Sequence, residues 1–399
     1  MIPTMKLQKH LLLFVMILVI SCKDHSLLKN KIISINEGIE AHFAPDKRVN
    51  IYDINFDLKN EKVTIKGETN STLAHQTLLD SLKNLGLNLI DQTRILPDSK
   101  VGDKKYAIAN NSVINIRSKP KHSAELGSQA LLGTLSKILD KQGDFYRIQT
   151  PDGYISWVDK GGIYPMRKEL LDVWSNSKKI IYTNTAGFVY EHKHLDQNII
   201  SDITLGGVLK YLSEDQKTYK VEYPDQRKGY IKKSEAILLK DWLKNNVATQ
   251  ESIEKTAKSM LGFPYLWGGT SSKGMDCSGF TKMTYLLNGF VIPRDASQQI
   301  NGGTIVDYDL NFKNLQKGDL LFFGTRAAAN KKQKVVHVGI WLGNDKMEFI
   351  HASGNVHISS MDKQNPLYDD FNKKRYLGSR RYLGVKDKNI IELKERMKL

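Results

Sequence analysis

The chain has 399 residues and a formal net charge of +16, from 59 basic and 43 acidic residues. This length predicts two or three domains. The lysines are spread along the whole chain without a nucleic-acid-binding motif, so they indicate a solvated surface and exclude nucleic acid as the expected partner. A general attraction to anionic wall polymers or lipid head groups is compatible with the charge.

The N-terminus reads MIPTMKLQKHLLLFVMILVISCKDHS. Lys6 and Lys9 precede an apolar run at residues 11–20, which is too short to cross a bilayer of about 30 Å as a helix. The end of this segment resembles a lipobox, so we expect residues 1–22 to be a lipoprotein signal peptide and Cys22 to be acylated. An ordinary signal peptide with an incidental cysteine is the alternative. We therefore expect an exported lipoprotein on the periplasmic or cell-surface side, attached to a membrane by its lipid.

Residues 30–104 are predicted to form a small α+β domain. RVNIYDINFDLKNEKVTIKGET alternates apolar and polar residues around a turn, which is typical of a β-hairpin. STLAHQTLLDSLKNLG places its leucines near helical spacing, and NLIDQTRILP then predicts another strand. No catalytic motif is found in this unit.

Residues 105–165 are predicted to form a small β-barrel, because they contain about five short strands separated by glycine, aspartate and proline. The runs NIRSKP, LLGT, FYRI and DGYISWV resemble bacterial SH3-like domains. Residues 172–240 repeat the pattern more faintly, with GGVL and GYIKK in the corresponding places. We therefore expect two tandem SH3-like domains, whose default role is adhesion to wall material or spacing.

Residues 245–399 predict two helices followed by an antiparallel sheet. The first helix lies in TQESIEKTAKSMLG, with Thr249 or Ser252 as its N-cap. A glycine-rich loop, FPYLWGGTSSKGM, leads to a second helix that Asp276 caps and Cys277 begins. Strand patterns follow at DLLFFG, KVVHVGIWLG and MEFIHASG. The overall fold class is therefore α+β.

Cys277 has no disulfide partner if Cys22 carries lipid, and an unpaired thiol is unusual in an exported protein. At the first turn of a helix, free N–H groups and the helix dipole favour a thiolate, so we expect a pKa lowered toward neutrality. The alternative is a buried cysteine that acts as a small apolar residue.

Two histidines on neighbouring predicted strands can serve such a thiol. His337 shares a strand face with Gly339, whose small size is expected to leave room for a substrate. His351 ends the next strand and can fix the tautomer of His337, as the third member of a triad does. A metal site is the rival use, but no C-x-x-C or close histidine pair accompanies it. We expect no metal or cofactor, and we interpret His357 as a surface residue.

YLWGGTSSKGMDCSGF, HVGIWLG and FIHASG together resemble the NlpC-type cysteine peptidases of bacterial cell walls, which have a papain-like fold. The resemblance covers residues 245–399. It implies that Cys277 is the nucleophile, His337 the general base and His351 the orienting residue. It further implies that Tyr265 lines the active site, although this tyrosine can equally be a packing aromatic. Backbone N–H at Cys277 would meet the oxyanion.

The complete layout resembles the YkfC-type γ-D-glutamyl dipeptidyl-peptidases, which cut murein peptides that carry a free N-terminal L-alanine. A free ammonium must be met by carboxylates, because a buried unpaired charge costs several kcal/mol. By this resemblance Asp295, Glu125 and Tyr154 bind the substrate. Asp295 is also a candidate helix N-cap, and Glu125 alone would be read as a surface residue. The remaining substrate-binding candidates are Trp157, Asp276, Ser278 and Ala296.

Ala296 stands where many relatives have serine, which removes a side-chain hydrogen bond and leaves recognition of the D-glutamyl carboxylate open. The resulting prediction is a monomeric, lipid-anchored cysteine peptidase that releases L-Ala-D-Glu from murein peptides. Two alternatives are a non-catalytic wall-binding protein and a cysteine-dependent acyltransferase or amidase.

Overall fold

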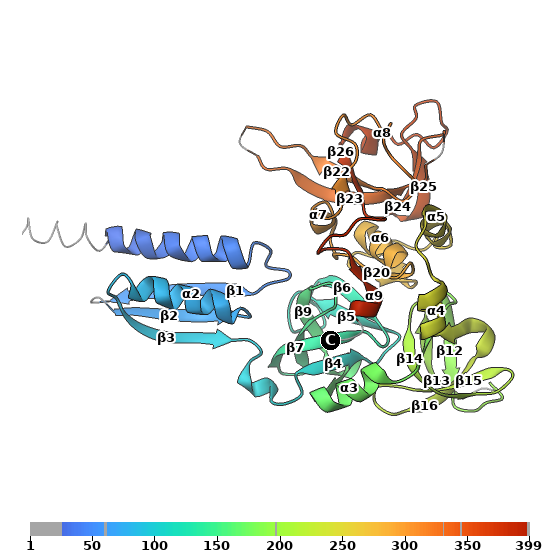
Figure 1. The fold of residues 1–399 in the computed structure, drawn as a ribbon, viewed down its shortest axis with the longest axis horizontal. Helices are drawn as coiled ribbons and strands as arrows, with labels where there is room; N and C mark the ends of the chain where they lie inside the picture. The colour runs from blue at the N-terminus through green and yellow to red at the C-terminus, as the bar shows by residue number, and fades with distance from the viewer. Residues whose placement is uncertain (1–25, 60–61, 196–197, 330, 344, 397–399) are drawn as a thin grey trace, which may run out of the picture. The chain divides into compact units, whose positions relative to one another are not determined.

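The computed structural model describes residues 26–59, 62–195, 198–329, 331–343 and 345–396 (Figure 1). The chain forms two compact units, Met1–Ser99 and Lys100–Leu399. The expected signal peptide and Cys22 lie outside the described residues. Within the described ranges, no helix is both long enough and apolar enough to cross a membrane.

The first unit is the expected α+β domain. Residues 26–43 are helical, and four further elements follow: β1 (Tyr52–Lys59), β2 (Lys62–Thr69), α2 (Thr72–Lys83) and β3 (Asn88–Ile95). β1 and β2 pair antiparallel, whereas β2 and β3 pair parallel. A parallel pair needs a crossover connection, and α2 supplies it. Ser71 caps α2 by accepting a hydrogen bond from the backbone N–H of Ala74.

The second unit begins with a seven-stranded antiparallel sheet in the order β10-β4-β7-β8-β9-β5-β6. After a short 3₁₀ helix, η1 (Ser99–Val101), its elements are β4 (Tyr106–Ala109), β5 (Val113–Arg117), β6 (Leu126–Leu131), β7 (Leu135–Gln142), β8 (Phe145–Gln149), β9 (Ile155–Asp159), η2 (Lys160–Gly162) and β10 (Ile163–Met166). Its interior is a cluster of small and β-branched residues that includes Ile114, Ile138 and Ile148. We refer to this sheet as the first barrel.

A second seven-stranded sheet, the second barrel, follows helix α3 (Lys168–Asn176) in the order β13-β12-β16-β15-β14-β11-β17. Its elements are β11 (Lys179–Tyr182), β12 (Ala186–Tyr190), β13 (Ile199–Thr204), β14 (Val208–Glu214), β15 (Thr218–Glu222), β16 (Lys228–Lys232), η3 (Lys233–Glu235) and β17 (Ala236–Leu238). Helix α4 (Leu239–Asn245) leads out of it.

The remainder of the chain builds a six-stranded sheet in the order β21-β26-β22-β23-β24-β25. Its strands are β21 (Thr304–Ile305), β22 (Leu320–Thr325), β23 (Lys334–Trp341), β24 (Glu348–Ser353), β25 (Asn355–Ser360) and β26 (Tyr376–Arg381). The helices are α5 (Gln250–Lys258), α6 (Cys277–Leu286), α7 (Ala296–Gln299), α8 (Asp370–Lys374) and α9 (Leu393–Arg396). Two small sheets pair β18 (Thr270–Ser271) with β19 (Gly274–Met275) and β20 (Phe290–Val291) with β27 (Ile391–Glu392).

The six-stranded sheet is buried on both faces. One face packs against α5 and α6 through a cluster that includes Phe280, Phe322 and Val338. The other face carries a separate aromatic cluster that includes Phe323 and Trp341. Both predicted helices are present, and Thr249 caps α5 in a reciprocal capping box with Ser252.

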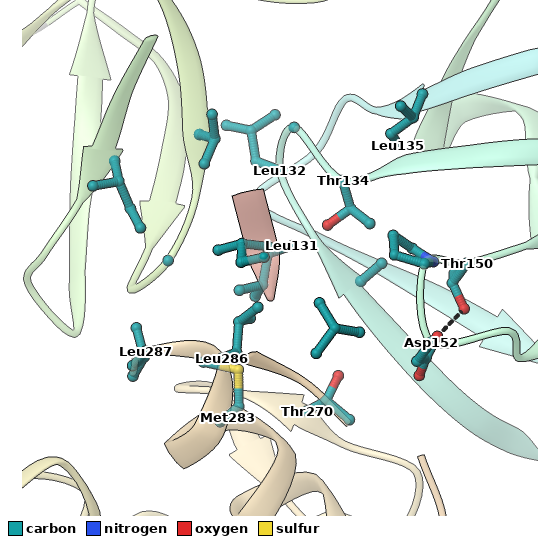
Figure 2. Close-up of a pocket in the computed structure, with 18 of the residues that line it drawn as sticks. Leu131, Leu132, Thr134, Leu135, Thr150, Asp152, Thr270, Met283, Leu286 and Leu287 are labelled. Carbon is teal, nitrogen blue, oxygen red and sulfur yellow. Dashed lines mark hydrogen bonds between the residues drawn. The ribbon is translucent and has the colours of Figure 1, made fainter. Parts of the chain in front are cut away.

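Both barrels meet the second half of α6. A cavity there is lined largely by apolar side chains, among them Leu131 and Leu132 from the first barrel, Val208 from the second and Met283 and Leu286 from α6 (Figure 2). Polar contacts close the same junction, since the Gln129 side chain accepts hydrogen bonds from Thr270 N and Ser271 Oγ, both at 3.0 Å.

A buried ion pair also holds the first barrel against α6. Lys282 Nζ donates to Asp152 Oδ2 at 2.6 Å, and the two side chains are 13% and 1% exposed. Burial opposes ionisation of Asp152, but Lys282 and the Thr150 hydroxyl hold the pKa of this carboxyl below its usual value. The charge of Asp152 is therefore compensated only while the barrel stays docked on α6.

We expect Lys282→Met to lower the free energy of unfolding by about 3–5 kcal/mol, because it leaves the buried Asp152 carboxylate without its partner. Chemical denaturation at neutral pH measures this loss. The matched control is Lys160→Met, which breaks an exposed pair with Asp144 and should leave the free energy of unfolding nearly unchanged. Equal effects of the two variants would contradict the prediction.

Candidate active site

The glycine-rich loop ends at Asp276, and α6 begins with Cys277, as the sequence predicted. The Asp276 side chain accepts a hydrogen bond from Gly279 N at 2.7 Å, which caps the helix. Cys277 is the free cysteine of the described residues, and it is 8% exposed. It packs in one core cluster with Val338 of β23, the strand that carries His337.

The predicted lowering of the thiol pKa is wrong for this structure. Burial, followed by the Asp276 carboxylate, raises the pKa of the Cys277 thiol to about 12. The Ser278 and Val338 amides act in the opposite direction but are outweighed. The thiol is therefore neutral, and it needs a base that takes its proton as the reaction begins.

His337 and His351 lie side by side on β23 and β24. His337 Nε2 is 2.7 Å from His351 Nδ1. The second ring nitrogen of His351, Nε2, is 3.1 Å from the hydroxyl of Ser359 on β25. All three residues are buried, with exposed fractions of 7%, 1% and 7%. Since Nε2 of His337 is engaged by His351, Nδ1 is the nitrogen left to serve the thiol.

Burial lowers the pKa of His337 well below its ordinary value, and it lowers the pKa of His351 to about 3. Both imidazoles are therefore neutral at physiological pH. One set of tautomers satisfies the whole chain, with His337 Nε2–H donating to His351 and His351 Nε2–H donating to Ser359. That set leaves His337 Nδ1 unprotonated, which is the form that accepts a proton from a thiol.

Of two expectations about neighbouring residues, the one for Gly339 is wrong and the one for His357 holds in part. A side chain at Gly339 would meet the Phe349 ring at 2.9 Å and His351 at 3.2 Å, so this glycine makes room for the second histidine rather than for a substrate. His357 is half-buried, and its ring centroid lies 4.4 Å from that of His351. It therefore packs against His351 while part of its side chain stays exposed, with Nδ1 in exposed contacts to Asn355.

Asp276 also pairs with Arg294, which sequence reasoning missed. Arg294 donates to both Asp276 oxygens, at 3.0 and 2.6 Å, and to Ser278 Oγ at 2.9 Å. Its side chain is 1% exposed. Burial alone would lower the pKa of Arg294, but Asp276 raises it above its usual value, so the guanidinium stays charged. The arginine immediately before Asp295, in an otherwise apolar run, was the available sequence signal.

Tyr265 lies near the thiol, in the same loop. Burial, then the Cys277 and Asp276 charges, raise the pKa of its hydroxyl to about 12. Its ring is half-buried against the core cluster that contains Cys277. The packing and site interpretations of this tyrosine are therefore both compatible with its position.

The first barrel reaches the loop that precedes Cys277. Glu125 Oε1 accepts a hydrogen bond from Trp267 Nε1 at 2.8 Å, although the two residues are 142 positions apart. Tyr154 lies against Gly127, where an added Cβ would meet its hydroxyl at 2.7 Å. Trp157 is 7% exposed, and its ring centroid lies 4.8 Å from the Arg147 guanidinium on the face of the sheet opposite the interior cluster.

Asp295 and Ala296 form the start of α7. Asp295 occupies the N-cap position, and its backbone N–H donates to the Gln298 side chain at 3.1 Å. Its side chain is 25% exposed, and the nearest Arg294 nitrogen is 3.9 Å away. Ala296 is buried at 7% exposure. The N-cap interpretation of Asp295 is thus confirmed, and its side chain is partly exposed.

Comparison with known proteins matches residues 262–381 to the NlpC/P60 family and residues 112–164 to the bacterial SH3 domain. The chain is 32% identical over 277 residues to the γ-D-glutamyl-L-lysine dipeptidyl-peptidase of Bacillus cereus, covering 65% of this chain and 76% of that protein. The chain belongs to the NlpC/P60 family. It is a cysteine-type peptidase whose fold combines SH3-like and papain-like domains.

Two further NlpC/P60 relatives support the same grouping. The γ-D-glutamyl-L-lysine dipeptidyl-peptidase of Bacillus subtilis is 29% identical over 228 residues, which cover 55% of this chain and 70% of that protein. The crystal structure of an NlpC/P60 family protein from Bacillus cereus matches with a TM-score of 0.59 at 26% identity. That match covers 70% of this chain and 99% of the other, so it includes barrels as well as the peptidase domain.

We expect the alkylation rate of Cys277 by iodoacetamide to rise roughly tenfold per pH unit between pH 7 and 10, because the neutral thiol must lose a proton before it reacts. Mass spectrometry of the peptide that contains Cys277 measures the rate. Free N-acetylcysteine is the control, since its rate levels off above a pKa of about 8.5. A rate that is already constant below pH 8 would reveal a preformed thiolate instead.

We expect Ser359→Ala to reduce kcat about tenfold with little change in KM, because His351 loses the partner that fixes its tautomer. The assay is cleavage of a γ-D-glutamyl-L-lysine peptide, the bond named for the relatives. Ser359→Thr keeps the hydroxyl and should recover most of the activity. If alanine and threonine behave alike, Ser359 does not position His351.

Proposed function

We propose that this peptidase hydrolyses the bond between the γ-carboxyl of D-glutamate and the diamino acid in murein peptides that carry a free N-terminal L-alanine. The names of the relatives from Bacillus cereus and Bacillus subtilis support this substrate class. The observation that carries the proposal is the hydrogen bond between Glu125 of the first barrel and Trp267, ten residues before Cys277. The Glu125 carboxylate would then lie at the end of the site that receives the substrate amine.

Recognition of the free amine requires negative charge. An ammonium that leaves water must be met by carboxylates, since an unpaired buried charge costs several kcal/mol. Glu125 and Asp295 approach from the barrel and from α7, and Tyr154 offers a hydroxyl from the same side of the barrel. The barrel would then stop the substrate after two residues. A stem peptide still linked to glycan would be too long, so the enzyme would act on released fragments.

The proposed reaction begins when His337 Nδ1 takes the thiol proton and Cys277 Sγ attacks the γ-carbonyl carbon. The backbone N–H of Cys277, at the start of α6, faces no carbonyl of its own helix and would stabilise the oxyanion. His337 then gives its proton to the departing amine of the diamino acid. Water, deprotonated by His337, hydrolyses the thioester and releases L-Ala-D-Glu. His351 holds the ring of His337 throughout.

The surroundings of the enzyme are part of the same proposal. Residues 1–22 would direct export, and lipid on Cys22 would hold the folded chain at a membrane on the periplasmic or cell-surface side. The protein would work there as a monomer, since the proposed site draws all its residues from one chain. Released murein peptides are the substrate that such a location would supply.

The test compares free L-Ala-γ-D-Glu-L-Lys, its N-acetylated form and intact sacculi. We expect the purified protein to release L-Ala-D-Glu from the free tripeptide, to cut the N-acetylated form at least tenfold more slowly and to leave sacculi intact. Cys277→Ala should abolish cleavage. Efficient cutting of sacculi but not of the tripeptide would defeat the proposal, and activity that survives Cys277→Ala would defeat the thiol mechanism.

Glu125→Gln sharpens the test, because the amide oxygen can still accept from Trp267 while the charge is lost. We expect kcat/KM for the free tripeptide to fall about 10- to 100-fold, and the preference over the N-acetylated form to shrink by a similar factor. Glu222→Gln is the matched control, since Glu222 forms ion pairs with Lys210 and Lys228 in the second barrel. It should leave both rates unchanged.

A further inference from the structure

Arg375 lies beside the histidine pair, on elements that contribute nothing to the amine end of the site. It is the residue between α8 and β26, and its carbonyl oxygen accepts a hydrogen bond from Gly324 N at 2.8 Å. Gly324 follows Phe323, which pairs with His337 across the sheet and whose ring centroid is 5.6 Å from that imidazole. Arg375 is therefore anchored two strands from His337.

The guanidinium of Arg375 is held in one orientation. Its Nε–H donates to Asn372 Oδ1 at 2.9 Å, and its central carbon lies 4.1 Å from the centroid of the Phe371 ring. Asn372 is itself buried and fixed, because its backbone N–H and its side-chain NH₂ both donate to the Asp369 carboxylate, at 2.9 and 2.5 Å. The Asp369 charge is thus used to orient Asn372, which in turn orients the arginine.

The two terminal nitrogens of Arg375 form no hydrogen bond or ion pair within the described ranges. The nearby Asp370 pairs with Lys374 and is not available to it. A half-buried guanidinium with both Nη groups unused presents a fork that matches the two oxygens of a carboxylate. The Nε and ring contacts leave this fork preorganised, so little side-chain entropy is lost when a carboxylate binds.

The charge of Arg375 also acts on the two histidines. Burial is the main cause of the lowered pKa values of His337 and His351, and the charge of Arg375 lowers both further. Burial also lowers the pKa of Arg375, and the Asp369 carboxylate opposes that change. The backbone anchor at Gly324 places Arg375 on the side of His337 where β22 and β26 lie, whereas Glu125 and Asp295 belong to the first barrel and to α7.

We propose that Arg375 binds the carboxylate of the diamino acid that leaves, so that the enzyme selects peptides that end directly after the scissile bond. This inference rests on the proposed function and adds the second half of substrate recognition. The enzyme would recognise the substrate as a zwitterion. Its ammonium would bind the carboxylates of Glu125 and Asp295 at one end, and its terminal carboxylate would bind Arg375 at the other. The enzyme then measures the length of the peptide from both ends.

The experiment compares L-Ala-γ-D-Glu-L-Lys as the free acid with the same tripeptide as its C-terminal carboxamide. We expect the wild-type protein to cleave the acid with a kcat/KM about 10- to 100-fold above that of the amide. Arg375→Gln should lose this factor on the acid and change the rate on the amide less than about twofold. Arg375→Lys should fall between the two, because an ammonium cannot bind both oxygens as a fork.

Arg326→Gln is the matched control. Arg326 is exposed and donates Nη2–H to the carbonyl of Tyr376, the residue after Arg375, so the variant removes the same charge nearby. It should keep the preference for the acid. A charge effect on the histidines alone would instead lower kcat on both peptides in Arg375→Gln.

Equal cleavage of acid and amide by the wild-type protein would overturn the role of Arg375 and leave the proposed function standing. Equal losses on the two peptides in Arg375→Gln would overturn it as well. Failure of the wild-type protein to cut either peptide would overturn the proposed function, and this inference with it.

Discussion

The site depends on the carboxylate of Asp276. One of its oxygens caps α6 through Gly279 N, the other accepts from Gly268 N at 2.9 Å in the glycine-rich loop, and both accept from the buried Arg294. A buried ion pair contributes little net stability, because desolvation of the two charges opposes their attraction. Its value here is geometric, since one group fixes the helix that carries Cys277, the loop before it and the segment that leads into α7.

The same carboxylate disfavours ionisation of the catalytic thiol. It lies beside the sulfur and, together with burial, holds the thiol in its neutral form. The neutral state protects an unpaired cysteine from oxidation, which attacks the thiolate. Reactivity then depends on His337, whose free nitrogen is selected by the contacts of His351 and Ser359. An unreactive resting thiol and a correctly oriented base are thus two consequences of one arrangement.

Local signals predicted much of this architecture. The cap at Asp276, the capping box at Thr249 and the strand that carries His337 all follow from short sequence patterns, and the structure has each of them. What could not be predicted comes from contacts between distant segments. The pairing of Arg294 with Asp276, the contact of Ser359 with His351 and the bond between Glu125 and Trp267 become visible only after folding. The thiol pKa was misjudged because a helix terminus can be read from sequence, whereas the degree of burial of one sulfur cannot.

Helix α6 joins the reaction to the assembly of the whole second unit, since the nucleophile occupies its first turn and Lys282 and Met283 occupy its far half. Those far-half side chains are covered by barrel residues, Asp152 among them. The peptidase segment, residues 245–399, is consequently packed against the barrels through the same helix that carries the nucleophile. Removal of the barrels would expose apolar side chains such as Met283, and the unpaired ammonium of Lys282, on the helix that positions the sulfur of Cys277.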